Sequence, residues 1–92
     1  ANEEAVKELQ DLLKGTPSDK NGAVAYYFLG QCYMRLNKPD EAIKAFTDAT
    51  VKYPKEKTSE ACQLEIAKVY EKKKDIPNMV KTYQDFITKF PD

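Results

Sequence analysis

Histidine is absent from this chain of 92 residues, and only one of its 15 basic residues, Arg35, is an arginine. Without histidine, the chain lacks the commonest general base and the usual partner of a serine or cysteine nucleophile. Its 15 acidic residues balance the basic ones, so no net field draws it toward polyanions. Nucleic-acid binders usually carry a basic excess in which arginine grips phosphates and guanines. We therefore expect neither an enzyme nor a nucleic-acid-binding protein.

Long apolar runs and clustered glycines are also missing. No segment approaches the roughly 18 apolar residues that span a bilayer, so we do not expect membrane insertion. The first residues, Ala-Asn-Glu-Glu, have neither the basic start nor the apolar stretch of a secretory signal, although a start without Met is compatible with a processed protein or an excised domain. Gly15, Gly22 and Gly30 lie too far apart to cradle a phosphate. We predict no bound cofactor and no metal.

Cysteine is scarce. Cys32 and Cys62 match neither a disulfide framework nor a cluster of metal ligands. One interpretation is that both are small buried apolar side chains. The alternative is a disulfide bond, which requires an oxidising compartment. The sequence leaves both open.

The chain contains an internal repeat, because an offset of 37 residues aligns three of its segments. The positions that are identical in all three segments are Lys7, Lys44 and Lys81; Asp11, Asp48 and Asp85; and Pro17, Pro54 and Pro91. Apolar positions coincide as well, among them Val6, Ile43 and Val80. The intervening segments match once, since Leu29 aligns with Ile66 and Tyr33 with Tyr70.

Each aligned segment has apolar residues at helical spacing and ends before a proline, which forbids further helix. Pro39 and Pro77 suit the first positions of helices, and Thr58 or Ser59 can provide the N-cap of another. The sequence thus predicts five helices, at 2–14, 20–36, 39–52, 57–73 and 76–89. Because the loops are short, we expect an all-α solenoid of antiparallel helix hairpins.

Eight residues between positions 26 and 54 show a family resemblance. The residues concerned are Tyr26, Leu29, Gly30, Tyr33, Ala42, Phe46, Ala49 and Pro54. Their spacing closely resembles the tetratricopeptide repeat signature, in which small residues let two helices approach and large ones fill the surrounding space. The resemblance implies a right-handed superhelix forming a single domain over 1–92, with a half repeat at 2–17 and full repeats at 23–56 and 60–92. The last copy departs from the signature at Gln63 and Met79.

Repeats of 37 residues that end in Tyr53-Pro54 or Phe90-Pro91 resemble those of bacterial envelope proteins. The resemblance implies a location in the bacterial periplasm or cell envelope, with the cytoplasm as the alternative.

The family resemblance also implies a binding site, because the first helix of each hairpin lines a concave groove in tetratricopeptide arrays. The residues that it places there are Val24, Tyr27, Gln31, Met34, Arg35, Leu64, Lys68, Glu71 and Lys72. A surface with Tyr, Met and one Arg suits a partner peptide or helix with apolar anchors and an acidic group. The lysine and asparagine of the chaperone-binding members are not matched, because Tyr27 and Gln31 stand at part of that set.

Three alternatives concern the helices predicted at 20–36, 57–73 and 76–89. Helix 20–36 is apolar almost all round, so it can simply be the central helix enclosed by its neighbours. The charges at Glu65, Lys68 and Glu71 permit weak pairs within their helix, and the run 72–74 of three lysines suits a solvated helix end. The last helix has more apolar surface than one neighbour can cover, which predicts either further repeats or a homo-oligomer that stacks through its terminal helices. A protein-interaction scaffold remains the leading hypothesis.

Overall fold

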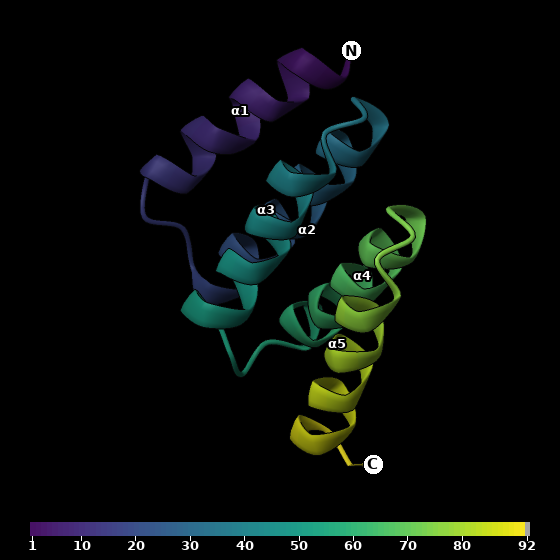
Figure 1. Ribbon diagram of the computed structural model, residues 1–92. Helices are drawn as coiled ribbons and strands as arrows, with labels where there is room; N and C mark the ends of the chain where they lie inside the picture. Colours follow the sequence, from purple (N-terminus) through teal and green to yellow (C-terminus); the bar gives the residue numbers. More distant parts are fainter. Residues whose placement is uncertain (92) are drawn as a thin grey trace.

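The structure, a computed structural model, describes residues 1–91, and within them the chain forms five α-helices and no strand (Figure 1). The helices are α1 (Asn2–Lys14), α2 (Asp19–Arg35), α3 (Pro39–Lys52), α4 (Lys57–Lys72) and α5 (Ile76–Lys89). The five predicted helices are confirmed, and no end differs from its prediction by more than one residue. The all-α hairpin architecture is confirmed as well.

The helices form two layers in a slab of 34 × 28 × 14 Å. Each helix packs against the next along the chain, and α2 also packs against α4. Within the described part of the chain, the backbones of α1, α3 and α5 do not come within packing distance of one another. In Figure 1 the α2–α3 and α4–α5 hairpins stand side by side, with α1 at the edge remote from α5. The two hairpins are therefore joined both by the packing of α3 on α4 and along the α2–α4 layer.

The core lies where α2, α3 and α4 meet, around the fully buried ring of Phe46. Ala42, Ala45 and Ala49 of α3 are buried beside it, and they keep the helices close. A Cβ atom at Gly30 of α2 would overlap the Phe46 ring. The hairpin thus depends on one large residue that fills the space left by small ones, as close packing requires.

Helix ends agree with most of the predicted signals. Pro39 and Pro77 lie in the first turns of α3 and α5, and the Asp75 side chain accepts a hydrogen bond of 3.3 Å from the backbone N–H of Asn78. Ser18 caps α2 in the same way, at 3.2 Å from the N–H of Asn21. These bonds satisfy backbone donors that a helix leaves free at its start.

The predicted cap of α4 is wrong. The helix begins at Lys57, directly after Glu56, and neither Thr58 nor Ser59 caps it. Ser59 lies inside the first turn and is buried, and its hydroxyl donates a hydrogen bond of 3.0 Å to the carbonyl of Ala49 in the last turn of α3. A buried hydroxyl needs such a partner, and the Ala49 oxygen has a second lone pair to accept it beside the bond of 2.9 Å from the backbone N–H of Tyr53.

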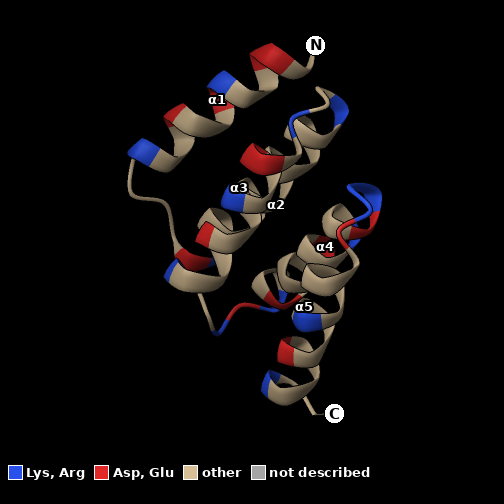
Figure 2. Cartoon of the chain, in the orientation of Figure 1, with Lys and Arg blue, Asp and Glu red and all other residues tan. Residues whose placement is uncertain are grey.

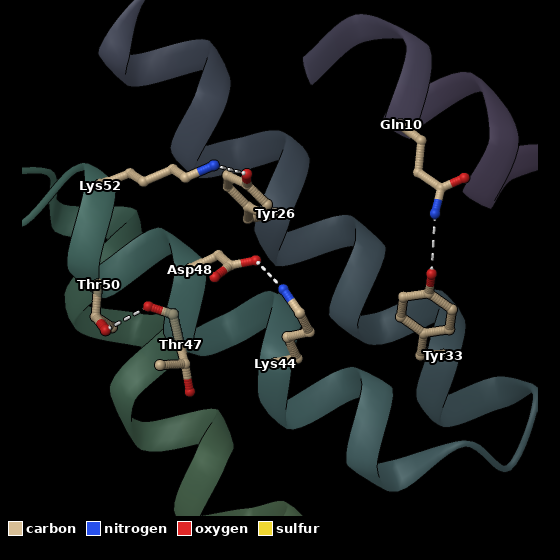
Figure 3. Close-up of polar contacts among 8 residues, drawn as sticks. All are labelled: Gln10, Tyr26, Tyr33, Lys44, Thr47, Asp48, Thr50 and Lys52. Carbon is tan, nitrogen blue, oxygen red and sulfur yellow. Dashed lines mark hydrogen bonds and ion pairs between the residues drawn. The ribbon is translucent and has the colours of Figure 1, made fainter. Parts of the chain in front are cut away.

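Charged residues that repeat along the sequence pair on the exposed faces of the outer helices. Lys44 and Asp48 of α3 lie 3.2 Å apart (Figure 3). Lys81 and Asp85 of α5 lie 3.3 Å apart. Both are pairs four residues apart, which support a helix only slightly. The identities at these positions therefore reflect solvated helix surfaces.

Both cysteines are free and buried, so the first interpretation of Cys32 and Cys62 is confirmed. Burial raises the pKa of the Cys62 thiol from 9.0 to about 12, and the negative charge of Glu65 adds to the shift. The folded state thus holds this proton more tightly than the unfolded chain. The contribution to stability is complete below pH 9 and is lost as the pH rises from 9 toward 12.

We expect Cys62 to resist thiol reagents in the folded protein, because only the thiolate reacts. The measurement is the rate of reaction with an aromatic disulfide reagent at about pH 8, below the ordinary thiol pKa, in a Cys32→Ser variant that isolates Cys62. Reaction should begin only when urea unfolds the chain. Rapid reaction of the folded variant would contradict the burial of this side chain.

Candidate protein-binding face

A polar bridge joins α2 to α4 in the middle of their shared layer. The side-chain amide of Gln31 donates a hydrogen bond of 3.2 Å to Oε1 of Glu65, and Nζ of Lys68 donates one of 3.2 Å to Oε2 of the same carboxylate. The Glu65 side chain is mostly buried, whereas that of Lys68 is exposed. The predicted pair of Glu65 and Lys68 is confirmed, and it is part of a link between two hairpins.

Lys68 is held as a cation. Its hydrogen bond to Glu65 and the negative charge of that carboxylate raise the pKa of the ammonium, and smaller contributions come from Tyr83 and Tyr27. An ammonium group and an amide thus both donate hydrogen bonds to one carboxylate.

The nine residues predicted for the groove fall into two groups by exposure. The half-buried residues are Val24, Tyr27, Gln31, Met34 and Leu64. The exposed residues are Arg35, Lys68, Glu71 and Lys72. Of these nine residues, Gln31 and Lys68 donate hydrogen bonds to the same carboxylate, that of Glu65. We call these nine residues and Glu65 the α2–α4 face.

Tyr27 and Met34 have a second role that the sequence interpretation did not give them. Both pack against the core cluster, and the Tyr27 ring centroid lies 6.2 Å from that of Phe46. The assignment of these two residues to the groove alone is therefore incomplete. A helix whose apolar residues cover most of its circumference gives side chains at the edge of the core a share in both the core and the surface.

The neighbours of α2 leave one aromatic ring uncovered. The helix packs against α1, α3 and α4, as expected of a central helix. Phe28 nevertheless remains 51% exposed, with its ring 5.6 Å from that of Tyr27 in an edge-to-face arrangement. The alternative that α2 is merely enclosed by its neighbours thus holds for most of its surface and fails at Phe28.

Comparison with known families supports the repeat assignment. Two family models, each described as a tetratricopeptide repeat, match residues 23–56 and 61–92. The chain belongs to the tetratricopeptide repeat family. No curated protein and no solved structure matches the chain. Tetratricopeptide repeats generally mediate protein–protein interaction and bind proteins or peptides, and the family is typically not enzymatic.

Two other kinds of feature are absent from residues 1–91 of this tetratricopeptide domain. None of the helices there has the length and apolar character needed to cross a membrane. Those residues also hold no group of three or more side chains arranged to bind a metal ion.

Sequence reasoning missed one residue of the α2–α4 face, Glu65, and one exposed ring beside α1, Phe28. Phe28 and Glu65 are equivalent positions of the two repeats, 37 residues apart, and each directly follows a predicted groove residue. Glu65 was assigned only to a pair within its own helix, and Phe28 was counted as part of an apolar helix. The repeat offset alone shows that one position carries an aromatic ring and its equivalent a carboxylate, whereas the exposure of the ring depends on packing.

A cleft of about 440 Å³ lies on the other side of the domain, where α1 and α3 diverge over α2. Tyr26 and Tyr33 line it, but their hydroxyls are engaged (Figure 3). Lys52 donates a hydrogen bond of 2.8 Å to the Tyr26 hydroxyl, and Gln10 donates one of 3.1 Å to that of Tyr33. These bonds tie the signature tyrosines to neighbouring helices, so the cleft is a weaker candidate than the α2–α4 face.

The lysine run at the end of α4 is only partly a solvated helix end. Lys72 and Lys74 are exposed, as expected. Lys73 instead donates a hydrogen bond of 2.6 Å to Asp40 at the start of α3, and this bond raises its pKa. The α2–α3 and α4–α5 turns lie at the same end of the domain, where Figure 2 shows both as partly basic segments. The bond therefore joins the two hairpins at that end.

Proposed function

We propose that this tetratricopeptide domain is a protein-interaction module, not a catalyst, and that its α2–α4 face binds a partner peptide or helix. The observation that carries the proposal is the bridge of Gln31, Glu65 and Lys68. It fixes polar groups in the middle of the α2–α4 face. Half-buried apolar side chains lie on the same face, among them Val24, Tyr27 and Leu64. Ordered polar groups beside apolar anchors are a common basis of peptide recognition.

The charges of the face favour an acidic partner. Both oxygens of Glu65 accept hydrogen bonds, so this carboxylate is neutralised within the domain. Lys68 uses one of the three donors of its ammonium group on Glu65, which leaves two for a partner. Arg35 and Lys72 add exposed positive charges, opposed by Glu71. The expected partner therefore combines aromatic or aliphatic anchors with at least one carboxylate.

Selection of a phage-displayed library of random peptides on the immobilised domain tests this proposal. Selected peptides should contain apolar anchors and an acid, and Lys68→Ala should weaken their binding about tenfold because a charge-assisted bond is lost. Lys44→Ala is the matched control, since Lys44 is also exposed and paired with an acid within its own helix. Its binding should equal that of the parent. Peptides that bind both variants equally would place the site elsewhere.

A second candidate function is self-association through the terminal helices, so that copies stack. Large apolar side chains are exposed at both ends of the solenoid, at Leu12 and Phe28 on one side and on α5 on the other. Patches of this kind usually mark association. Stacking of α5 on α1 of the next copy would repeat from copy to copy and produce open-ended assemblies.

A further inference from the structure

One carboxylate of the α2–α4 face is held by two donors from two different helices. Oε1 of Glu65 accepts a hydrogen bond of 3.2 Å from the side-chain amide of Gln31 in α2, and Oε2 accepts one of 3.2 Å from Nζ of Lys68 in α4. Gln31 and Lys68 are equivalent residues of consecutive repeats, since 37 positions separate them. Two donors from one repeat position thus meet at a single acceptor, and only one of them is charged.

The three side chains differ in exposure, and this difference decides which of them a partner can reach. The Glu65 side chain is 20% exposed, whereas that of Lys68 is 62% exposed. Gln31 is half-buried. The carboxylate therefore needs hydrogen bonds from within the domain, because a mostly buried charge without partners is costly. Lys68 is the member of the three that a partner contacts most easily.

The pair of Lys44 and Asp48 shows what Lys68 and Glu65 would be without the amide. Lys44 also donates to an acid of its own helix at 3.2 Å, but within residues 1–91 no other side chain donates a hydrogen bond to Asp48. A pair of this kind on an exposed helix surface is weak. The amide of Gln31, which reaches across from the neighbouring hairpin, is what distinguishes the Glu65–Lys68 pair.

This amide determines how many protons of the Lys68 ammonium group bind to Glu65. A carboxylate has two oxygens, and an ammonium group has three protons. Because Gln31 satisfies one oxygen, Lys68 needs a single bond for the other and keeps two protons for a partner. Without the amide, Oε1 would lack a donor, and the ammonium group would turn toward both oxygens. The negative charge of Glu65 would also be less compensated, so an acid on the partner would be repelled more strongly.

We propose that Gln31 is a positioning residue that sets the preference of the α2–α4 face for a carboxylate over an amide, without contacting the partner. It acts through Glu65 and leaves Lys68 available to the acid of the partner. Since the amide lies on α2 and the ammonium group on α4, this preference depends on how one hairpin packs on the next. The inference rests on the proposed function, and it names the group by which the same site selects its partner.

A pair of matched peptides tests this role. A peptide selected on the parent domain is synthesised twice, once with its acidic residue and once with the corresponding amide, and fluorescence anisotropy gives the Kd of each. The parent should prefer the acid about tenfold, because a charge-assisted hydrogen bond is stronger than a neutral one. Gln31→Met, which keeps the length of the side chain and removes the donor, should reduce this preference to less than about threefold. The loss should come from weaker binding of the acidic peptide.

Gln10→Met is the matched control. Gln10 also donates a hydrogen bond from one helix to another, of 3.1 Å to the Tyr33 hydroxyl, but it lines the cleft on the other side of the domain. Its replacement should leave the preference of the parent unchanged. An unchanged preference in Gln31→Met, or an equal loss in Gln10→Met, would overturn the proposal.

A double-mutant cycle with Lys68→Met separates an indirect role of Gln31 from direct contact with the peptide. If Gln31 acts through Lys68, Gln31→Met should have no further effect on the preference in the Lys68→Met background. Losses that add would mean that the amide itself binds the peptide, and they would overturn the positioning role. Peptides that bind independently of Lys68 would overturn the proposed function and this inference together. Peptides that depend on Lys68 but not on Gln31 would overturn the inference alone.

Discussion

Replacement of Gly30 by alanine is expected to destabilise the domain by about 2 kcal/mol, even though alanine is the better helix former by about 1 kcal/mol. The added Cβ would overlap the ring of Phe46, which is fully buried and has no free space to enter. Overpacking of this kind typically costs 1–3 kcal/mol or more. In a domain of this size the loss corresponds to a fall of roughly 8–16 °C in Tm. Thermal unfolding followed by far-ultraviolet circular dichroism measures it.

Gly22→Ala is the matched control, because Gly22 is also a buried glycine of α2. A Cβ there would meet the hydroxyl end of the Tyr53 ring. That ring is half-buried at the end of α3, where it can move aside. We therefore expect a change within about 1 kcal/mol in either direction. Equal losses in the two variants would show that the close approach of α2 and α3 at Gly30 has no special importance.

Replacement of Phe46 by alanine is expected to cost about 3–5 kcal/mol, the usual range for deleting a buried aromatic ring. The side chain is 0% exposed and contacts helices on both sides of α3, so a cavity would open at the centre of the core. Because small domains have free energies of unfolding near the low end of about 5–15 kcal/mol, much of the variant should be unfolded. Urea unfolding of parent and variant gives the difference.

The repeat supplies the comparison for Phe46. Tyr83 is the equivalent residue of the last hairpin, but it is only half-buried because no further helix covers α5 in the described chain. Tyr83→Ala should therefore cost about 1–2 kcal/mol, which is less than the loss at Phe46. A loss as large as that of Phe46→Ala in dilute solution would mean that Tyr83 is covered more completely than the isolated chain shows.

Local signals in the sequence predicted the fold well because several helices are marked at an end by a proline or a capping residue. Prolines follow the helical stripes and open α3 and α5, so the bounds were constrained independently of any contact between helices. Ser59 shows the limit of such signals. Its type and place suit a cap, but the hydroxyl turns to a carbonyl of the preceding helix, and that choice depends on how α3 and α4 pack.

The candidate site could be predicted only in part for the same reason. The family resemblance selected nine residues by position, but it did not show that Glu65 joins Gln31 across two helices. That contact lies 34 residues apart in the sequence and follows from the packing of one hairpin on the next. The helical periodicity also could not show that Tyr27 contacts the ring of Phe46. A residue at the edge of the apolar side of a helix can contact both the core and the surface.

The buried hydrogen bond from Ser59 to Ala49 has a consequence for curvature. It connects the last turn of one hairpin to the first turn of the next, so one of the contacts that set the pitch of the solenoid lies inside the core, apart from the loop 53–56. Changes in that loop should leave this contact in place. Loss of the hydroxyl would remove one link between the hairpins, beside those of Gln31 with Glu65 and Lys73 with Asp40, and the shape presented to a ligand would be less tightly held without any substitution on the surface that contacts it.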